Sequence, residues 1–147
     1  MKFKKRKIQT QTQATDVKIL IIEDDYAIQC ATKDILENCG FKVEVVQNGA
    51  EALVFLNANK DSKPGLILLD LMMPVMDGWQ FLEKTAKDEH LSSIPVVVCS
   101  AVSTFERPIH QKNVKATLLK PISIEQLLTY ANRYCGPQPL LDQIIFE

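Results

Sequence analysis

The sequence predicts an α/β fold in which five short strands form a mainly parallel sheet with helices on both faces. Five short apolar segments alternate with segments whose apolar residues recur at helical spacing. With 147 residues, 46% hydrophobic and 24% charged, the chain has the length and composition of one globular domain with a substantial core. Alternation of this kind gives right-handed crossovers, which place helices on both faces of the sheet.

The first two predicted strands differ in their exposure. Val17–Ile22 is an apolar run typical of a buried strand, whereas Lys42–Val46 alternates charged and apolar residues, as expected at a sheet edge. The helix between them ends at Gly40. We expect its inward stripe to contain Leu36 and four further residues, Ile28, Ala31, Ile35 and Cys39. Asn48, with Glu51 three residues later, resembles a capping box that opens the next helix, through about Ala58.

The third strand is the uninterrupted apolar run Leu66–Leu69, which ends in Asp70. The helix after it is capped by Asp77, with Gln80 at the reciprocal position of a capping box. Phe81 and Leu82 follow, and we expect both to face inward. A carboxylate at the end of a buried strand is costly unless a metal, a cation or bond chemistry uses it. Asp70 is therefore the first candidate site residue.

The second half continues the alternation. Pro95–Cys99 is a buried strand ending in Ser100, and Ala116–Leu119 is the fifth strand, ending in Lys120. Between them, Val102–Lys112 is irregular, because it contains a proline. The last helix opens with a Ser123–Gln126 capping box, ends at Gly136, and has an inward stripe of four residues, Ile124, Leu127, Leu128 and Ala131.

Polar residues follow four of the five strands: Glu23, Asp24, Asp70, Ser100 and Lys120. In a parallel sheet the carboxyl ends of the strands meet at one edge, where such folds bind ligands. Converging carboxylates repel one another and need a cation, and an oxygen-only ligand set selects Mg²⁺ or Mn²⁺. A carboxylate beside that ion can attack phosphorus, while the lysine and the hydroxyl bind phosphoryl oxygens. The simpler alternatives are a lysine that only pairs with Asp70 and a serine that only caps a turn.

Charge and cysteine content exclude several classes of protein. Five basic residues and no acid occur among the first seven residues. Because the whole chain has a net charge of −1, the remaining residues together carry a net charge of −6. An acidic body does not indicate nucleic-acid binding, and the basic start is expected to be a disordered extension or a contact with an anionic partner. No apolar run is long enough for a membrane span, and no secretory signal is present. The four cysteines lack metal-ligand spacing and are expected to be reduced and packed, so a cytoplasmic location is expected.

Four motifs carry a resemblance to a known family. They are ILIIEDD (19–25), LLDLMMPVMDGW (68–79), PVVVCSA (95–101) and LLKP (118–121). In this order they resemble the response-regulator receiver domain of two-component phosphorelays, over roughly residues 17–135. The resemblance implies a flavodoxin-like, doubly wound five-stranded parallel sheet in the order 2-1-3-4-5.

The resemblance also implies roles for the residues at the strand ends. Asp70 would be the phosphoacceptor, and Glu23 and Asp24 would hold Mg²⁺ together with Asp70 and the backbone carbonyl of Met72. Ser100 would be the switch hydroxyl and Lys120 the lysine that contacts the phosphoryl group. The family commonly has an aromatic residue three positions before that lysine, where this chain has Thr117.

The function that follows is a stand-alone, chemotaxis-regulator-like receiver at residues 16–135, between a basic tail (1–15) and a C-terminal tail (136–147). It would take a phosphoryl group from a histidine kinase or a histidine phosphotransfer protein and signal through protein contacts, without a DNA-binding domain. A receiver module of a hybrid kinase is an open alternative. An aspartyl-phosphate phosphatase would have a second acid where Met72 stands, and a flavodoxin-like cofactor carrier would have a phosphate loop in place of Glu23 and Asp24.

Overall fold

Five parallel strands form one sheet in the order β2-β1-β3-β4-β5, which confirms the predicted fold class and strand order. The computed structural model describes residues 16–101 and 107–136. The elements of these residues are β1 (Lys18–Ile22), α1 (Tyr26–Asn38), β2 (Lys42–Val46), α2 (Gly49–Ala58), β3 (Leu66–Asp70), α3 (Gly78–Ala86), β4 (Val96–Ser100), β5 (Val114–Leu119) and α4 (Ile124–Cys135).

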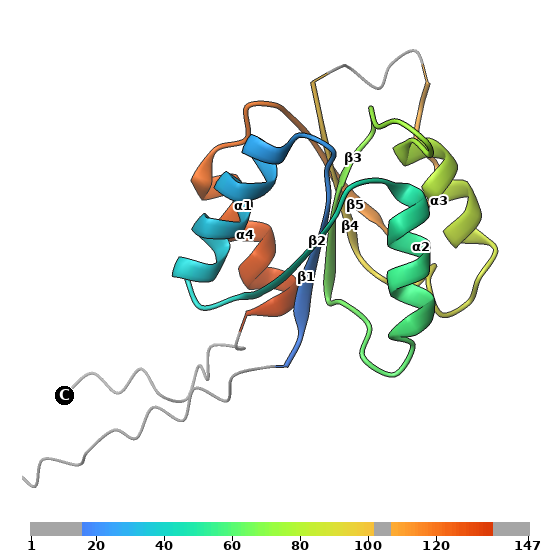
Figure 1. The fold of residues 1–147 in the computed structure, drawn as a ribbon, viewed down its shortest axis with the longest axis horizontal. Coiled ribbons are helices and arrows are strands. Elements are labelled where there is room, and N and C mark those ends of the chain that lie inside the picture. Colours follow the sequence, from blue (N-terminus) through green and yellow to red (C-terminus); the bar gives the residue numbers. More distant parts are fainter. Residues whose placement is uncertain (1–15, 102–106, 137–147) are drawn as a thin grey trace, which may run out of the picture.

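The sheet separates two helical layers (Figure 1). Helices α1 and α4 cover one face, and α2 and α3 cover the other. Strands β3 and β4 are buried at every position and β1 at all but its first, because each lies inside the sheet and is covered on both faces. The edge strands are less covered: β2 is half-buried after its exposed first residue, and β5 alternates half-buried and exposed residues. The predicted edge position of Lys42–Val46 is confirmed.

Side chains at the first turns determine where the helices begin. The capping boxes predicted at Asp77 and Ser123 are both formed. Each of these side chains accepts a hydrogen bond from the backbone N–H three residues later, and the side chain of that later residue, Gln80 or Gln126, accepts one from the backbone N–H of the cap. The box predicted at Asn48 is wrong in one half. Asn48 caps α2. The Glu51 side chain, however, accepts a hydrogen bond at 2.9 Å from the backbone N–H of Gln47, the residue before the cap, and not from the N–H of Asn48.

The predicted inward stripes are wrong at several positions. In α1 the buried residues are Leu36 and Gln29, whereas Ile28 and Ile35 are only partly covered. Ala31 and Cys39 are exposed, and so is Ile124 at the start of α4. In α4, Leu127 and Ala131 are buried as predicted. The first turns of these two helices therefore turn apolar side chains toward a space that the described residues do not fill.

Three further expectations bear on the outline of the domain. The fifth strand begins at Val114, two residues earlier than predicted. Of the segment expected to be irregular, residues 102–106 lie outside the described residues, and residues 107–112 contain no helix or strand. The N-terminal tail 1–15 and residues 137–147 also lie outside them. None of the helices described is long and apolar enough to cross a membrane.

None of the four cysteines forms a disulfide, so all are reduced thiols as predicted, but they are not all packed. Cys99 and Cys135 are buried, Cys30 is half-buried, and Cys39, the C-terminal cap of α1, is exposed. Burial raises the pKa of Cys99 and of Cys135 to about 12.

Candidate functional site

The predicted site residues come from the carboxyl ends of four strands. Glu23 and Asp24 follow β1, Asp70 and Ser100 are the last residues of β3 and β4, and Lys120 follows β5. Because all strands run parallel, these positions lie at one edge of the sheet. The register places Asp70 opposite Cys99, one residue before Ser100.

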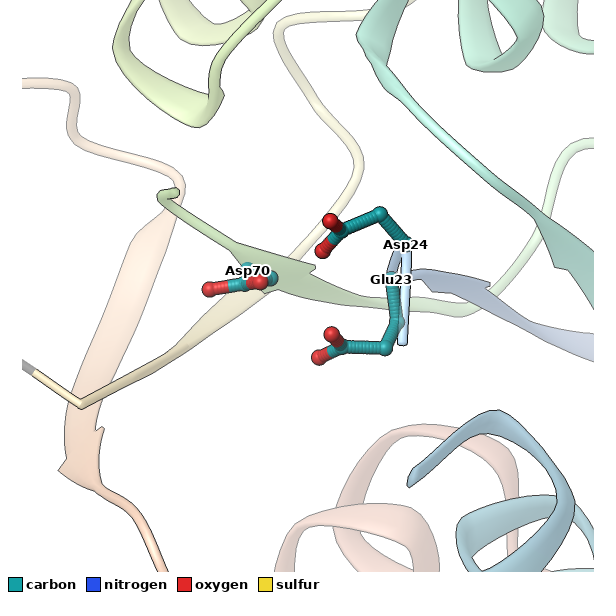
Figure 2. A group of neighbouring side chains, drawn as sticks. All are labelled: Glu23, Asp24 and Asp70. Atoms are coloured by element: carbon teal, nitrogen blue, oxygen red, sulfur yellow. The ribbon is translucent and has the colours of Figure 1, made fainter. Parts of the chain in front are cut away.

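Three carboxylates gather at this edge. Glu23, Asp24 and Asp70 each offer one oxygen, and these oxygens all lie within 4.8 Å of one another. In Figure 2, Glu23 and Asp24 project from the end of β1 toward the side where Asp70 lies on β3. Glu23 and Asp70 are only 4% and 5% exposed, whereas Asp24 lies at the surface. The cluster therefore opens to solvent on the side of Asp24.

Lys120 supplies the positive charge that this cluster needs. Its Nζ lies 2.7 Å from Glu23 Oε2 and 3.5 Å from Asp70 Oδ2. Burial raises the pKa of Glu23, the Lys120 hydrogen bond opposes that increase, and the Asp70 charge adds to it. Burial lowers the pKa of Lys120, but the hydrogen bond to Glu23 and the charge of Asp70 outweigh it, so this pKa is raised overall. The lysine is thus held in its charged form between two carboxylates.

Backbone and amide groups fix the orientation of the two buried carboxylates. The N–H of Asp25 donates to Glu23 Oε1 at 3.2 Å, and the N–H of Met72 donates to Asp70 Oδ1 at 3.2 Å. The Gln29 amide donates to the backbone carbonyl of Glu23 from the first turns of α1. Asp25 also caps α1, so the turn that follows β1 is bonded on both sides.

Glycine is required where α3 begins against the end of β3. The N–H of Gly78 donates to the Leu71 carbonyl at 3.0 Å. A Cβ at Gly78 would lie 2.6 Å from the carbonyl oxygen of Asp70 and 2.8 Å from Leu71 Cα. Both atoms belong to the backbone and cannot swing away, so only glycine permits this approach. The start of α3 consequently supports the backbone that carries Asp70.

The remaining predicted residues lie around the cluster. Ser100 is fully buried at the end of β4, and its carbonyl accepts from the N–H of Lys120 at 2.8 Å. The Met72 side chain is 57% exposed beside Asp70, and Thr117 is exposed on β5. Position 117 therefore carries a small polar side chain at the surface of the edge strand.

The sequence analysis missed two supporting residues, Gln29 and Gly78. Gln29 precedes the buried Leu36 by seven residues, so helical spacing alone places both on one face of α1. The glycine lies beside Asp77 in a turn signal that was interpreted only as a helix cap. Its close approach to β3 depends on the crossing of two elements, which no local pattern contains.

The donor set fits a hard divalent cation. All three groups are carboxylates, and neither histidine nor cysteine is among them. Mg²⁺ and Mn²⁺ prefer such oxygen ligands and retain water on the open side. The Lys120 ammonium group is the positive charge that these residues contribute, and a divalent cation bound to the carboxylates would add more beside it.

Comparisons with known proteins agree with this arrangement. The family model described as response regulator receiver domain matches residues 19–132. Response regulator Rre1 of Synechocystis sp. is 32% identical over 117 residues, which make up 78% of this chain and 49% of Rre1. Sensor histidine kinase TmoS of Ectopseudomonas mendocina is 32% identical over 119 residues, 80% of this chain and 12% of TmoS. The crystal structure of the phosphorylated cyanobacterial phytochrome response regulator RcpA has a TM-score of 0.68 at 30% identity, covering 80% of this chain and 93% of that one.

This chain spans about half the length of Rre1. The family match extends from β1 into α4. It therefore includes every strand whose carboxyl end contributes a residue to the candidate site. The chain belongs to the family of response regulator receiver domains, the receivers of two-component signalling.

Proposed function

We propose that residues 16–135 form a receiver that accepts a phosphoryl group on Asp70 and then signals through protein contacts. The donor is a phosphohistidine on a histidine kinase or on a histidine phosphotransfer protein. The names of two relatives support this choice, because TmoS is a sensor histidine kinase and RcpA is a phosphorylated response regulator.

One observation carries the proposal. The Asp70 carboxylate is buried at the end of β3, 3.5 Å from the Lys120 ammonium group and within 4.8 Å of an oxygen of Glu23 and of Asp24. A purely structural salt bridge needs only one carboxylate for each lysine. Three carboxylates and one lysine leave a net negative charge, which a divalent cation would balance.

The transfer step exchanges one bond for another. An Asp70 carboxylate oxygen forms a bond to phosphorus while the bond from phosphorus to the donor imidazole nitrogen breaks, and that nitrogen keeps the electron pair. The N–H of Met72 already donates to Asp70 Oδ1, which leaves Oδ2, on the side of Lys120, for the new bond. The hydrogen bond thus orients the nucleophile.

Glu23, Asp24 and Asp70 would hold Mg²⁺ or Mn²⁺, with the Met72 carbonyl as a fourth protein ligand. When bound, the ion supplies positive charge to the phosphoryl oxygens as they approach the carboxylates. The Lys120 Nζ moves from the carboxylates to a phosphoryl oxygen, and the Ser100 hydroxyl donates to another. The lysine begins this movement between its two acidic partners, 2.7 and 3.5 Å away.

Two alternatives share this chemistry. A receiver module within a hybrid kinase would use the same residues, and the match to a segment of TmoS supports it. An aspartyl-phosphate phosphatase is disfavoured, because Met72 stands where that class of enzyme has its second acid. The Met72 thioether carries no ionisable proton, so it cannot act as the general acid or base of a catalytic cycle. We therefore propose a signalling protein rather than an enzyme.

Phosphorylation by acetyl phosphate tests the proposal. With Mg²⁺ present, intact-protein mass spectrometry should show one added phosphoryl group on the unaltered chain and none on Asp70→Asn. Asp25→Asn is the matched control, because asparagine keeps the cap of α1 and the change lies outside the proposed metal ligands. Equal labelling of Asp70→Asn and the control would refute the assignment of Asp70.

A further inference from the structure

We propose that the C-terminal segment of this chain, residues 137–147, packs into the groove between α1 and α4. There it covers an apolar cavity that the described residues leave open. The occupant is thus intramolecular, and it lies on the side of the sheet away from α2 and α3.

The groove contains a cavity of about 480 Å³. Its walls come from two helices, with Ile28 and Ile35 on α1 and Ile124 and Leu127 on α4. Glu23, Asp70 and Lys120 of the candidate site also line it. The walls are mainly aliphatic, so an apolar occupant gains more free energy there than a polar one.

The exposure of these walls is the feature that needs an explanation. Ile28 is 37% exposed and Ile124 is 56% exposed, although the spacing of apolar residues places both on inward stripes. Ala31, one helical turn after Ile28, is exposed as well and also lines the cavity. These stripes are wider than the surface that the described part of the domain covers.

The segment after α4 has the composition to cover them. It contains five large apolar residues among its eleven: Leu140, Leu141, Ile144, Ile145 and Phe146. The first four are spaced i, i+1, i+4 and i+5, which places them on one face of a helix. Two acids, Asp142 and Glu147, flank that face and would remain at the surface.

The segment is long enough to reach the groove. Helix α4 ends at Cys135, whose Sγ lies 3.8 Å from the Lys18 carbonyl at the amino end of β1. From there to Leu127 the helix rises about 12 Å, at 1.5 Å per residue. Eleven residues span about 16 Å as a helix and about 36 Å when extended. The backbone already leaves α4 in an extended conformation at Gly136 (φ −71°, ψ 152°).

Hydrogen exchange on the full chain tests the contact. In the double variant Ile144→Asp/Ile145→Asp, we expect amide exchange in α1 and the first turns of α4 to become about tenfold faster, because the apolar cover is lost. The matched control is Gln138→Asp/Gln143→Asp, which adds the same charge off the apolar face and should leave exchange unchanged. Equal exchange in the two double variants would overturn the proposal.

Photocrosslinking identifies the occupant directly. Benzoylphenylalanine at position 145 of the full chain, on the apolar face, should crosslink to residues 26–38 or 122–128 of the same molecule. The crosslink should disappear with Ala31→Arg in the groove and persist with Val54→Arg, a change at a 72% exposed position on α2. A mixture of ¹⁵N-labelled and unlabelled protein separates the outcomes. Crosslinks between two molecules would assign the groove to a second copy, and crosslinks to α2 or α3, or none, would refute the contact; each of these results overturns the proposal.

Discussion

Replacing Lys120 with methionine tests whether the Lys120 ammonium group and a divalent cation compete for the acidic cluster. The substitution keeps the length of the side chain and removes its charge. Glu23 and Asp70, which are 5% and 6% exposed at their side chains, then lose their shared positive partner. Without divalent cations, the folded protein must retain uncompensated carboxylates or bind an extra proton at neutral pH.

The size of the effect follows from the two distances. At an effective dielectric constant of about 20, charges separated by 2.7 and 3.5 Å attract by roughly 6 and 5 kcal/mol. Desolvation of the lysine, which is only 17% exposed, offsets much of that attraction. We expect a net decrease of about 3 kcal/mol in the free energy of unfolding, or roughly 12 °C in Tm for a domain of this size.

The same substitution should strengthen Mg²⁺ binding by about tenfold, because a positive charge no longer lies beside the carboxylates proposed to hold the ion. Urea unfolding in a chelating buffer measures the loss of stability, and isothermal titration calorimetry measures the affinity. Lys115→Met is the control, since Lys115 is exposed on β5, the strand that precedes Lys120, and its replacement should change stability by less than about 0.5 kcal/mol. Equal stability of the two variants, or weaker Mg²⁺ binding in Lys120→Met, would refute the competition.

Three further outcomes are expected. Gly78→Ala should lower the free energy of unfolding by about 1–3 kcal/mol in urea titrations, because the new Cβ would lie 2.6 Å from a backbone oxygen. Gly49→Ala should lower it by less, since the atoms nearest to that Cβ, at 2.9 Å, belong to a side chain that can move. Burial raises the pKa of Cys135 to about 12, so above about pH 9 the unfolded chain loses a thiol proton that the folded chain keeps, and stability falls as pH rises. Cys135→Ala should flatten that fall, and an unchanged slope between pH 9 and 10.5 would contradict it. The Arg107 guanidinium carbon lies 4.7 Å from the Trp79 ring centroid, and the Arg107 backbone carbonyl accepts a hydrogen bond from the indole N–H. Arg107→Ala should therefore shift the tryptophan emission and lower the free energy of unfolding by up to about 1 kcal/mol. An unaltered spectrum would show that the contact with the guanidinium is absent in solution.

The strands were predictable because a strand that is buried on both faces of the sheet needs an uninterrupted run of apolar residues. Uninterrupted runs such as Leu66–Leu69 belong to interior strands, and the alternation in Lys42–Val46 belongs to an edge strand. Helix stripes were less reliable. The pattern places Ile28 and Ile124 inward, but whether the body of the domain covers an apolar stripe depends on how two helices diverge, which is a tertiary property.

The gathering of charged residues at one edge was predictable for a similar reason. Parallel strands with polar ends bring Glu23, Asp70 and Lys120 together whatever the details of packing. The choice of the nearer partner was not predictable: the sequence indicates Asp70, whereas the structure places Nζ closer to Glu23. A difference of less than an ångström depends on side-chain rotamers, which the order of the strands does not determine.

The bond between Lys120 and Glu23 joins residues 97 positions apart. No segment shorter than nearly the whole domain contains both partners, and Asp70 lies between them in the chain. Loops this large close late in folding, because the entropy of closure must be met before the contact forms. A nascent or partly unfolded chain therefore presents an isolated, hydrated aspartate with no counterion of its own. The positive charge beside Asp70 is therefore in place only once β5 has joined the sheet and carried the chain to Lys120.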